Sequence, residues 1–185
     1  MSAKEFPLPS GLPIPEDDGA ADHLQGQALP PLVLPSTAGR DVDLSHIGTC
    51  VLYAYPMTGQ PGVALPDGWD SIPGARGCTP QSCGFRDHYE QLQVLGYGVF
   101  GLSTQSSDYQ REARDRLHLP FQLLSDSSLA LKHALNLPTF RVAGMELFKR
   151  LTLIVIGGCI SKVFYPVFPP DQNADEVLFW IGANA

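Results

Sequence analysis

Two cysteines in a stretch that begins a helix constrain this chain more than any other feature. Cys78 and Cys83 lie five residues apart, Thr79 is a good N-cap residue and Pro80 suits the first helical position. Apolar side chains then recur at helical spacing, at Phe85, Tyr89, Leu92 and Leu95. We therefore predict a helix over about residues 80–95.

This placement has consequences for both thiols. Cys78 would directly precede the first turn, where unpaired backbone N–H groups and the helix dipole favour an anion, here a thiolate. Residues i and i+5 of a helix are roughly 8 Å apart, on faces about 140° apart. A disulfide needs Cα atoms within about 7 Å. Cys78 and Cys83 can therefore join only if the first turns of the helix unwind.

The composition excludes several classes of protein. The chain has 185 residues, 44% of them hydrophobic, which suits one globular domain with a sizeable core. Its formal charge of -7 argues against nucleic-acid or anionic-membrane partners, which need a basic face. The longest apolar run, residues 151–156, is too short to span a membrane.

The cysteines bear on the cellular compartment. No secretory signal or Arg-rich transit peptide is visible, so we expect a cytoplasmic protein whose thiols are kept reduced. There a close cysteine pair is typically catalytic, redox-sensing or metal-binding. Cys50 lies in an apolar run and is interpreted as a core thiol, and Cys159, beside a hairpin turn, as a bystander.

Proline and glycine divide the chain. Residues 1–28 form a proline-rich arm that we expect to be mobile or extended, and residues 29–185 form the folded domain. Residues 56–77 are an unusually long connection with several prolines and glycines. Because it directly precedes Cys78, this insertion either covers the site and restricts which substrates enter, or is a tolerated surface loop.

Strands and helices alternate along the domain. A hairpin is predicted around residues 32–44 and a buried strand at 50–55. Further strands are expected at 99–102, 121–124, 139–148, 150–156 and 159–164, the last two joined at Gly157-Gly158, and further helices at 108–118 (capped by Ser107 or Asp108), 125–135 and 175–181. This order predicts a three-layer α/β domain with a mixed sheet.

The pattern Cys-Thr-x-x-x-Cys-x-Phe-Arg-Asp at residues 78–87 resembles the peroxiredoxins, in particular their peroxiredoxin Q (bacterioferritin comigratory protein) group. Further landmarks match in the same order, at residues 53–56, 119–126 and 150–152. The resemblance covers roughly residues 28–182. The combination is specific, whereas any one motif alone is weak.

The resemblance implies a thioredoxin-like fold and reduction of hydrogen peroxide or organic hydroperoxides without a metal or organic cofactor. It implies that Cys78 is the peroxidatic residue and Cys83 the resolving one, joined in an intramolecular disulfide that a thioredoxin-like dithiol protein reduces. Arg150 matches the arginine that faces the thiolate and the peroxide oxygens. We expect a monomer or weak homodimer.

One departure from the family pattern is clear. The family usually has Pro-x-x-x-Thr-x-x-Cys before the nucleophile, but Ser71 and Ala75 stand at these positions, because the insertion interrupts the motif. Pro56 and Thr58 are candidates to fold back and supply the missing groups. Gln81 stands where many members have glutamate.

Other interpretations of the cysteine pair remain open. A general thiol–disulfide oxidoreductase also uses a helix-start cysteine, although typically in Cys-x-x-Cys spacing. Cys78, Cys83 and His88 are a possible metal set, although zinc normally takes four ligands at tighter spacings. In a third interpretation the pair is structural or redox-sensing, and the arm and the insertion are the working surfaces of a binding module.

Overall fold

The computed structural model describes residues 6–184. Its strands are β1 (Val33–Pro35), β2 (Asp41–Asp43), β3 (Cys50–Ala54), β4 (Gly98–Ser103), β5 (Gln122–Ser125), β6 (Thr139–Val142), β7 (Met145–Phe148), β8 (Leu151–Ile156) and β9 (Cys159–Phe164). Its α-helices are α1 (Cys78–Asp87), α2 (Tyr89–Val94), α3 (Ser107–Arg116), α4 (Ala130–Leu135) and α5 (Asn173–Ala183). Short 3-10 helices are η2 (Leu44–His46), η3 (Trp69–Ser71) and η4 (Pro170–Gln172).

A five-stranded mixed sheet in the order β5-β4-β3-β8-β9 forms the middle layer. β3, β4 and β5 are parallel, while β8 and β9 are antiparallel to their neighbours. β3 lies at the centre and is fully buried, as its continuous apolar run predicts. The predicted α/β class, with a mixed sheet between two outer layers, is confirmed.

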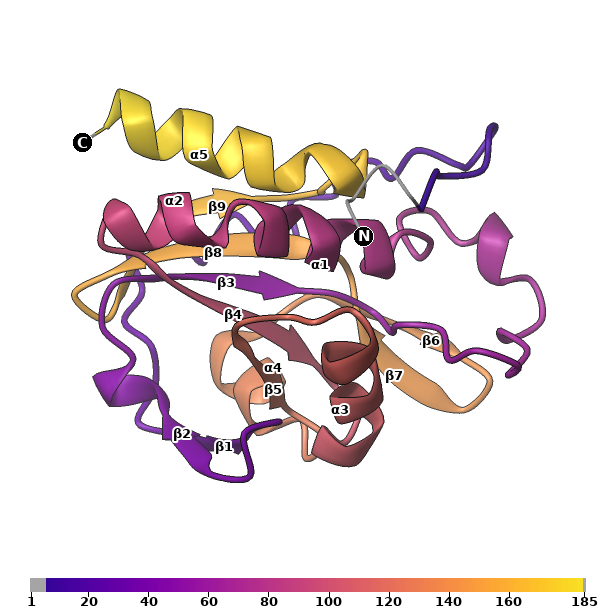
Figure 1. Cartoon of the computed structure of the whole chain (residues 1–185), viewed down its shortest axis with the longest axis horizontal. Coiled ribbons are helices and arrows are strands. Elements are labelled where there is room, and N and C mark those ends of the chain that lie inside the picture. Colours follow the sequence, from indigo (N-terminus) through magenta and orange to yellow (C-terminus); the bar gives the residue numbers. More distant parts are fainter. Residues whose placement is uncertain (1–5, 185) are drawn as a thin grey trace.

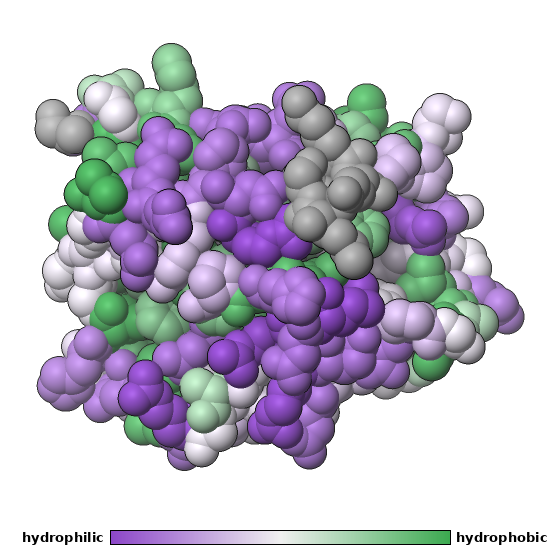
Figure 2. Space-filling model, viewed as in Figure 1, coloured by the Kyte–Doolittle hydropathy of each residue, from purple (hydrophilic) through white to green (hydrophobic). Residues whose placement is uncertain are grey.

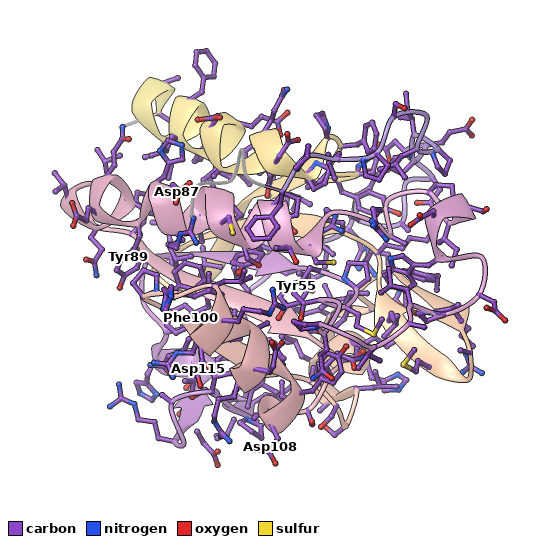
Figure 3. All side chains as sticks on the ribbon, turned by 45° about the vertical axis from the view of Figure 1, so that its right-hand side comes forward. Tyr55, Asp87, Tyr89, Phe100, Asp108 and Asp115 are labelled. Carbon is purple, nitrogen blue, oxygen red and sulfur yellow. The ribbon has the colours of Figure 1, made fainter. Side chains whose placement is uncertain are left out.

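Successive side chains of β3 point to opposite faces of the sheet. Val51 and Tyr53 pack with α1, α2 and α5, which cover one face (Figure 1). Cys50 and Leu52 pack on the other face, against α4, the β1–β2 hairpin and residues 21–29. Tyr55 follows β3 into the interior, where its hydroxyl donates to Gln110 Oε1 at 2.7 Å (Figure 3). Asp108 and Asp115 lie on the outer side of α3 in the same view.

The predicted helix over residues 80–95 is wrong at its start and in its continuity. α1 begins at Cys78, because Gly77 takes a left-handed conformation and acts as N-cap, so Thr79 lies inside the helix. The helix is interrupted at His88, whose φ of -102 and ψ of 8 are not helical, and α2 follows. Leu95 is 40% exposed, so the apolar stripe ends on the surface.

Three other predicted elements needed correction. The helix expected over residues 125–135 is shorter, because Ser125 ends β5 and α4 begins only at Ala130. Residues 139–148 are two strands, because Ala143 and Gly144 both have positive φ and turn the chain into the β6–β7 hairpin, a separate two-stranded sheet. The cap of α3 is Ser106, whose hydroxyl accepts from the Tyr109 N–H. The turn at Gly157-Gly158 is confirmed, with β8 and β9 paired on either side.

The described part of the proline-rich arm has no regular structure over residues 12–18, forms turns between residues 19 and 26, and lies on the domain. Ala21 and Leu24 are buried in the core, and Asp18 accepts from Lys149 Nζ at 2.6 Å and from the Tyr165 hydroxyl at 2.7 Å. These hydrogen bonds, from Lys149 first, hold the pKa of Asp18 well below its usual range. The division of the chain near residue 28 stays a prediction. No helix within residues 6–184 has the length and apolar character that crossing a bilayer requires.

Candidate active site

Cys78 is the first residue of α1, and its side chain is 3% exposed. The chain reaches it through Gly77, whose φ of 104 favours glycine. A Cβ at Gly77 would also overlap Pro170 of η4. The turn into α1 therefore depends on a residue without a side chain, and it fixes Cys78 at the positive end of the helix.

Arg150, directly before β8, reaches the sulfur. Its Nη2 donates to Cys78 Sγ at 3.2 Å and lies 3.2 Å from each of the carbonyl oxygens of Gly74, Ala75 and Arg76. Arg150 is only 3% exposed, so the guanidinium is held in one place. One cation thus contacts the thiol and the loop that leads to it.

An uncharged network holds the other side of Arg150. Its Nη1 donates to Gln81 Oε1 in α1, and Gln81 Nε2 donates to Asn173 Oδ1 at 3.0 Å. Thr152 of β8 donates to the same Asn173 oxygen at 2.7 Å. Gln81, Thr152 and Asn173 are all buried. Apart from the sulfur, every acceptor of Arg150 among the described residues is a neutral oxygen, so its charge is available to an anion at Cys78.

Cys83 lies inside α1, is completely buried and is a free thiol, as Cys78 is. Burial raises the pKa of Cys83. α1 is continuous between the two cysteines, so the helix geometry keeps them apart. The helix is held by Phe85, which stacks on Tyr53 at 4.6 Å between ring centroids, and by the Tyr53 hydroxyl, which donates to Ser82. A Cys78–Cys83 disulfide still requires unwinding.

The residues around the interrupted motif are separated. Ser71 is exposed in η3, whereas Ala75 is buried and its carbonyl lies 3.7 Å from Cys78 Sγ, as an acceptor for the thiol. Thr58 is 1% exposed, and its hydroxyl has no hydrogen-bond partner among the described residues. Met57 and Gly59, on either side of Thr58, line a cavity together with Cys78. The insertion therefore brings the neighbours of Thr58 to the cysteine.

The remaining candidates lie elsewhere. Cys50 is completely buried in β3, as interpreted from the sequence, and Cys159 is exposed. His88 pairs with Asp175 at 3.0 Å. Within residues 6–184, no group of three or more His, Cys, Asp and Glu side chains is arranged to hold a metal ion. The suggested set of Cys78, Cys83 and His88 forms no such group.

Sequence reasoning missed two parts of the site. Asn173 carried no signal, because its role comes from η4 and α5 folding back over α1. Gln81 stood out only as a departure from glutamate, whereas the structure makes it the link between Arg150 and Asn173.

Comparison with known proteins gives a consistent result. Residues 24–178 match the Redoxin family model. Chloroplastic peroxiredoxin Q of Sedum lineare is 29% identical over 178 residues, covering 95% of this chain and 87% of the relative. Peroxiredoxin bcp1 of Schizosaccharomyces pombe is 31% identical over 135 residues, covering 68% of this chain and 62% of the relative.

Solved structures agree with the fold. Peroxidoxin BcpB from Mycobacterium tuberculosis superposes with a TM-score of 0.70 at 23% identity, covering 87% of this chain and 97% of that chain. The bacterioferritin comigratory protein of Xanthomonas campestris has a TM-score of 0.65 at 20% identity, with 95% and 99% covered. The chain therefore belongs to the Redoxin family and is a peroxiredoxin Q-like protein, a thiol-dependent peroxidase.

Proposed function

We propose that Cys78 is the peroxidatic residue, Arg150 stabilises its thiolate and the peroxide, and Cys83 resolves the oxidised form. The observation that carries the proposal is the 3.2 Å contact between Arg150 Nη2 and Cys78 Sγ at the start of α1. A cation and a helix N-terminus that meet at one sulfur favour the thiolate, which is the nucleophilic form.

The first step consumes the peroxide. The Cys78 thiolate attacks the terminal oxygen of the hydroperoxide, the O–O bond breaks, and the sulfur becomes a sulfenic acid after giving two electrons. Water from hydrogen peroxide, or an alcohol from an organic hydroperoxide, leaves after its oxygen takes a proton from solvent. Arg150 donors are placed to stabilise the negative charge that moves from sulfur to the leaving oxygen.

Resolution follows by condensation. The Cys83 thiol attacks the sulfenic sulfur of Cys78, an S–S bond forms and water is released. Because both cysteines lie in α1, this step requires local unwinding and takes Cys83 out of its buried place. A reduced thioredoxin-like dithiol protein then exchanges with the disulfide, regenerates both thiols and becomes oxidised itself.

Thr58 belongs to this proposal as a further contact for the peroxide. Its buried hydroxyl has no partner among the described residues, and its neighbours line the cavity at Cys78. A buried hydroxyl without a partner costs free energy unless a ligand satisfies it. The Thr58 hydroxyl would thus take the place of the threonine hydroxyl that the family usually has at the position of Ala75.

We also propose a reducing compartment, the cytoplasm. Supporting this, a close pair of cysteines is typically catalytic or redox-active in a reducing compartment, where permanent disulfides are rare. A monomer or weak homodimer stays a prediction.

Thiol counting tests the roles of the cysteines. Fully reduced protein is mixed with one equivalent of hydrogen peroxide, and peroxide and free thiols are followed. The wild type and the control Cys159→Ser should consume peroxide rapidly and lose two thiols. Cys78→Ser should do neither, and Cys83→Ser should accumulate a sulfenic acid that dimedone traps. Wild-type consumption no faster than that of an ordinary free thiol would reject the proposal.

A further inference from the structure

A second cavity, of about 370 Å³, is lined by Arg150 and not by Cys78. Among the described residues, it shares no lining residue with the cavity at Cys78. The loop before α1 lies between the two, because Gly74 lines the second cavity whereas Ala75 and Arg76 line the first. We call the second one the Arg150 cavity. The cation that contacts the proposed peroxidatic sulfur therefore also borders a separate space.

The lining of the Arg150 cavity is largely apolar. Most of it belongs to residues between 15 and 18 of the arm, 72–74 of the insertion and 165–167 after β9. Figure 2 shows apolar surface on the right-hand side of the molecule, where Figure 1 draws the insertion, so the apolar side chains of this segment are not all used in packing. The apolar side chains that line the cavity are those of Pro15, Ile72, Pro73, Phe140, Pro166 and Val167.

The walls of the Arg150 cavity are held by contacts within the chain. Asp18 accepts from Lys149 Nζ at 2.6 Å and from the Tyr165 hydroxyl at 2.7 Å, which fixes the arm on this side. The Gly74 carbonyl accepts from Arg150 Nη2 at 3.2 Å, which fixes the end of the insertion. The cavity therefore exists before a ligand enters.

Arg150 has one donor that lacks an acceptor. Its Nη1 and Nη2 atoms donate to Gln81, to Cys78 and to the three loop carbonyls described above. Its Nε atom is buried and has no hydrogen-bond partner among the described residues. A buried donor without an acceptor costs free energy, and more so when it belongs to a charged group. An acceptor that reaches Nε from the Arg150 cavity would remove this cost.

The charges around the cavity favour an anionic acceptor. Its charged lining residues are Glu16, Asp18, Lys149 and Arg150, and of these Asp18 and Lys149 pair with each other. Glu16 is exposed, so solvent screens its charge. Arg150 is only 3% exposed and has no carboxylate partner among the described residues. Because charges interact more strongly in a medium of low dielectric, the buried cation should outweigh the exposed carboxylate.

We infer that the Arg150 cavity binds a small monocarboxylate with an apolar body about the size of one ring. The carboxylate accepts from Arg150 Nε, and the body packs on Ile72 and Phe140. The volume of about 370 Å³ lies in the range of about 300 to 1,000 Å³ that small-molecule sites occupy. Binding at this site is independent of the proposed function, whereas its effect on Cys78 rests on that function.

Such a ligand would share the guanidinium with the Cys78 thiolate. Two anions that depend on one cation weaken each other, so the ligand should slow the reactions of Cys78 with peroxide and with iodoacetamide. By linkage, the thiolate should weaken binding of the ligand by the same factor that the ligand weakens the thiolate. The Arg150 cavity would thus be a regulatory site that acts on the cysteine through Arg150.

Calorimetric titration of the reduced protein at about pH 8 tests the binding. The probe is phenylacetate, which is ionised there, and its neutral isostere phenylacetamide is the control ligand. Phenylacetate should bind with a Kd of about 1 mM or tighter, as expected for roughly ten non-hydrogen atoms. Phenylacetamide should bind at least about fivefold more weakly, since hydrogen bonds to charged groups are the stronger ones. Cys78→Ser should bind phenylacetate about fivefold or more tightly than the wild type.

Two substitutions at exposed positions locate the ligand. Pro73→Asp places a carboxylate in the lining and should weaken phenylacetate binding about fivefold or more, whereas Glu16→Gln removes one and should strengthen binding about twofold to fivefold. The matched controls are Pro61→Asp in the insertion and Glu90→Gln in α2, both exposed and outside the lining. Both controls should keep the wild-type Kd.

Alkylation of Cys78 by iodoacetamide tests the coupling. Phenylacetate should slow it in a saturable way, with half of the effect at the measured Kd, and Pro73→Asp should need about fivefold more ligand. Glu16→Gln covers the case in which Pro73→Asp does not fold, and there the half-effect should come at a lower concentration.

Several outcomes would overturn the inference: no saturable binding, equal affinity for phenylacetamide, an unchanged Kd in Cys78→Ser, or a wild-type Kd in folded Pro73→Asp or in Glu16→Gln. A wild-type Kd in these last two variants would mean that the ligand lies elsewhere, for example in the cavity at Cys78. If phenylacetate binds as expected but the reduced protein consumes no peroxide, the proposed function alone fails. If peroxide is consumed with loss of two thiols but phenylacetate does not bind, only the Arg150 cavity fails as a site.

Discussion

Cys78 and Cys50 are both almost completely buried, at 3% and 0% exposed, yet their surroundings differ in kind. Cys78 begins a helix and accepts from Arg150. Cys50 lies in the central strand, in an apolar cluster, and burial raises its pKa to about 12. Depth in the core therefore does not distinguish the cysteine that we propose as peroxidatic from the one that we interpret as a core thiol. The groups that face each sulfur distinguish the two.

The two positions also differ in how the backbone reaches them. Cys50 follows a regular strand, where burial requires only an apolar side chain of suitable size. Cys78 follows a left-handed glycine and a loop whose carbonyls contact the same arginine. The surroundings of Cys78 thus depend on several long-range contacts, whereas those of Cys50 require one packing position.

Replacement of Arg150, the cation at Cys78, should have the largest effect on the contrast between Cys78 and Cys50. Arg150→Met is expected to lower the rate constant of peroxide consumption about a hundredfold to a thousandfold, as loss of an oxyanion donor does. The measurement is single-turnover oxidation of Cys78. Arg141→Met, where the side chain is 82% exposed, is the control and should leave the rate unchanged. A rate loss of less than about threefold would show that the helix start alone activates the thiol.

The glycine before Cys78 should matter more for stability than a glycine in the same conformation elsewhere. Gly77→Ala is expected to cost about 1–3 kcal/mol more than Gly96→Ala, since overpacking adds to the strain of positive φ. Both glycines have positive φ, but an added Cβ at Gly96 meets nothing within 4 Å, whereas at Gly77 it overlaps Pro170. Urea unfolding of the two variants measures the difference, and equal values would mean that η4 moves away without cost.

Gln81 should contribute less than Arg150, because it acts through the arginine. Gln81→Met removes the acceptor of Arg150 Nη1 and the donor to Asn173, and we expect about a tenfold loss in the rate of Cys78 oxidation, equivalent to about one hydrogen bond to a charged group. Gln93→Met, on the exposed side of α2, is the control and should react at the wild-type rate. An unchanged rate in Gln81→Met would show that the three loop carbonyls suffice to hold Arg150.

The smallest expected effect concerns Cys50 at alkaline pH. Its folded-state pKa is raised, so the protonated thiol contributes stability that is present below the unfolded pKa near 9 and is lost as pH rises toward 12. Cys50→Ala removes the titration of this thiol but leaves the titrations of Cys83 and of the tyrosines in place. The stability difference between wild type and Cys50→Ala should therefore shift against the wild type by about 1.4 kcal/mol per pH unit above pH 9.

Urea unfolding at pH 8 and pH 10 checks this prediction. Cys159→Ala, which removes an exposed thiol, is the control and should keep the wild-type pH dependence. A constant difference between wild type and Cys50→Ala at both pH values would contradict the apolar surroundings assigned to Cys50.

Several elements could be predicted from the sequence because their signals are local. The buried strand at Cys50–Ala54, the turn at Gly157-Gly158 and the cysteine at a helix start each depend on a few adjacent residues. Element ends were less predictable. The start of α1 depends on a positive φ at Gly77 and on packing against Pro170, which is distant in sequence.

The site shows the same division. Cys78, Cys83 and Arg150 could be chosen from the sequence, and the structure brings Cys78 and Arg150 together at 3.2 Å. Asn173 could not be chosen, because it reaches Gln81 only after the last helix packs over α1. The course of residues 56–77 was equally hidden, since Trp69 meets Phe140 across about 70 residues of chain (140 minus 69).

The sequence by itself determined the α/β class, the cysteine that begins the helix and the need to unwind that helix before a disulfide forms. Those conclusions follow from residue spacing and from the fixed geometry of a helix. Only the tertiary structure decided which groups face Cys78, because Arg150 and the walls of its pocket come from segments that meet through long-range packing. Chemistry at the sulfur depends on these neighbours, and a linear pattern does not contain their distances.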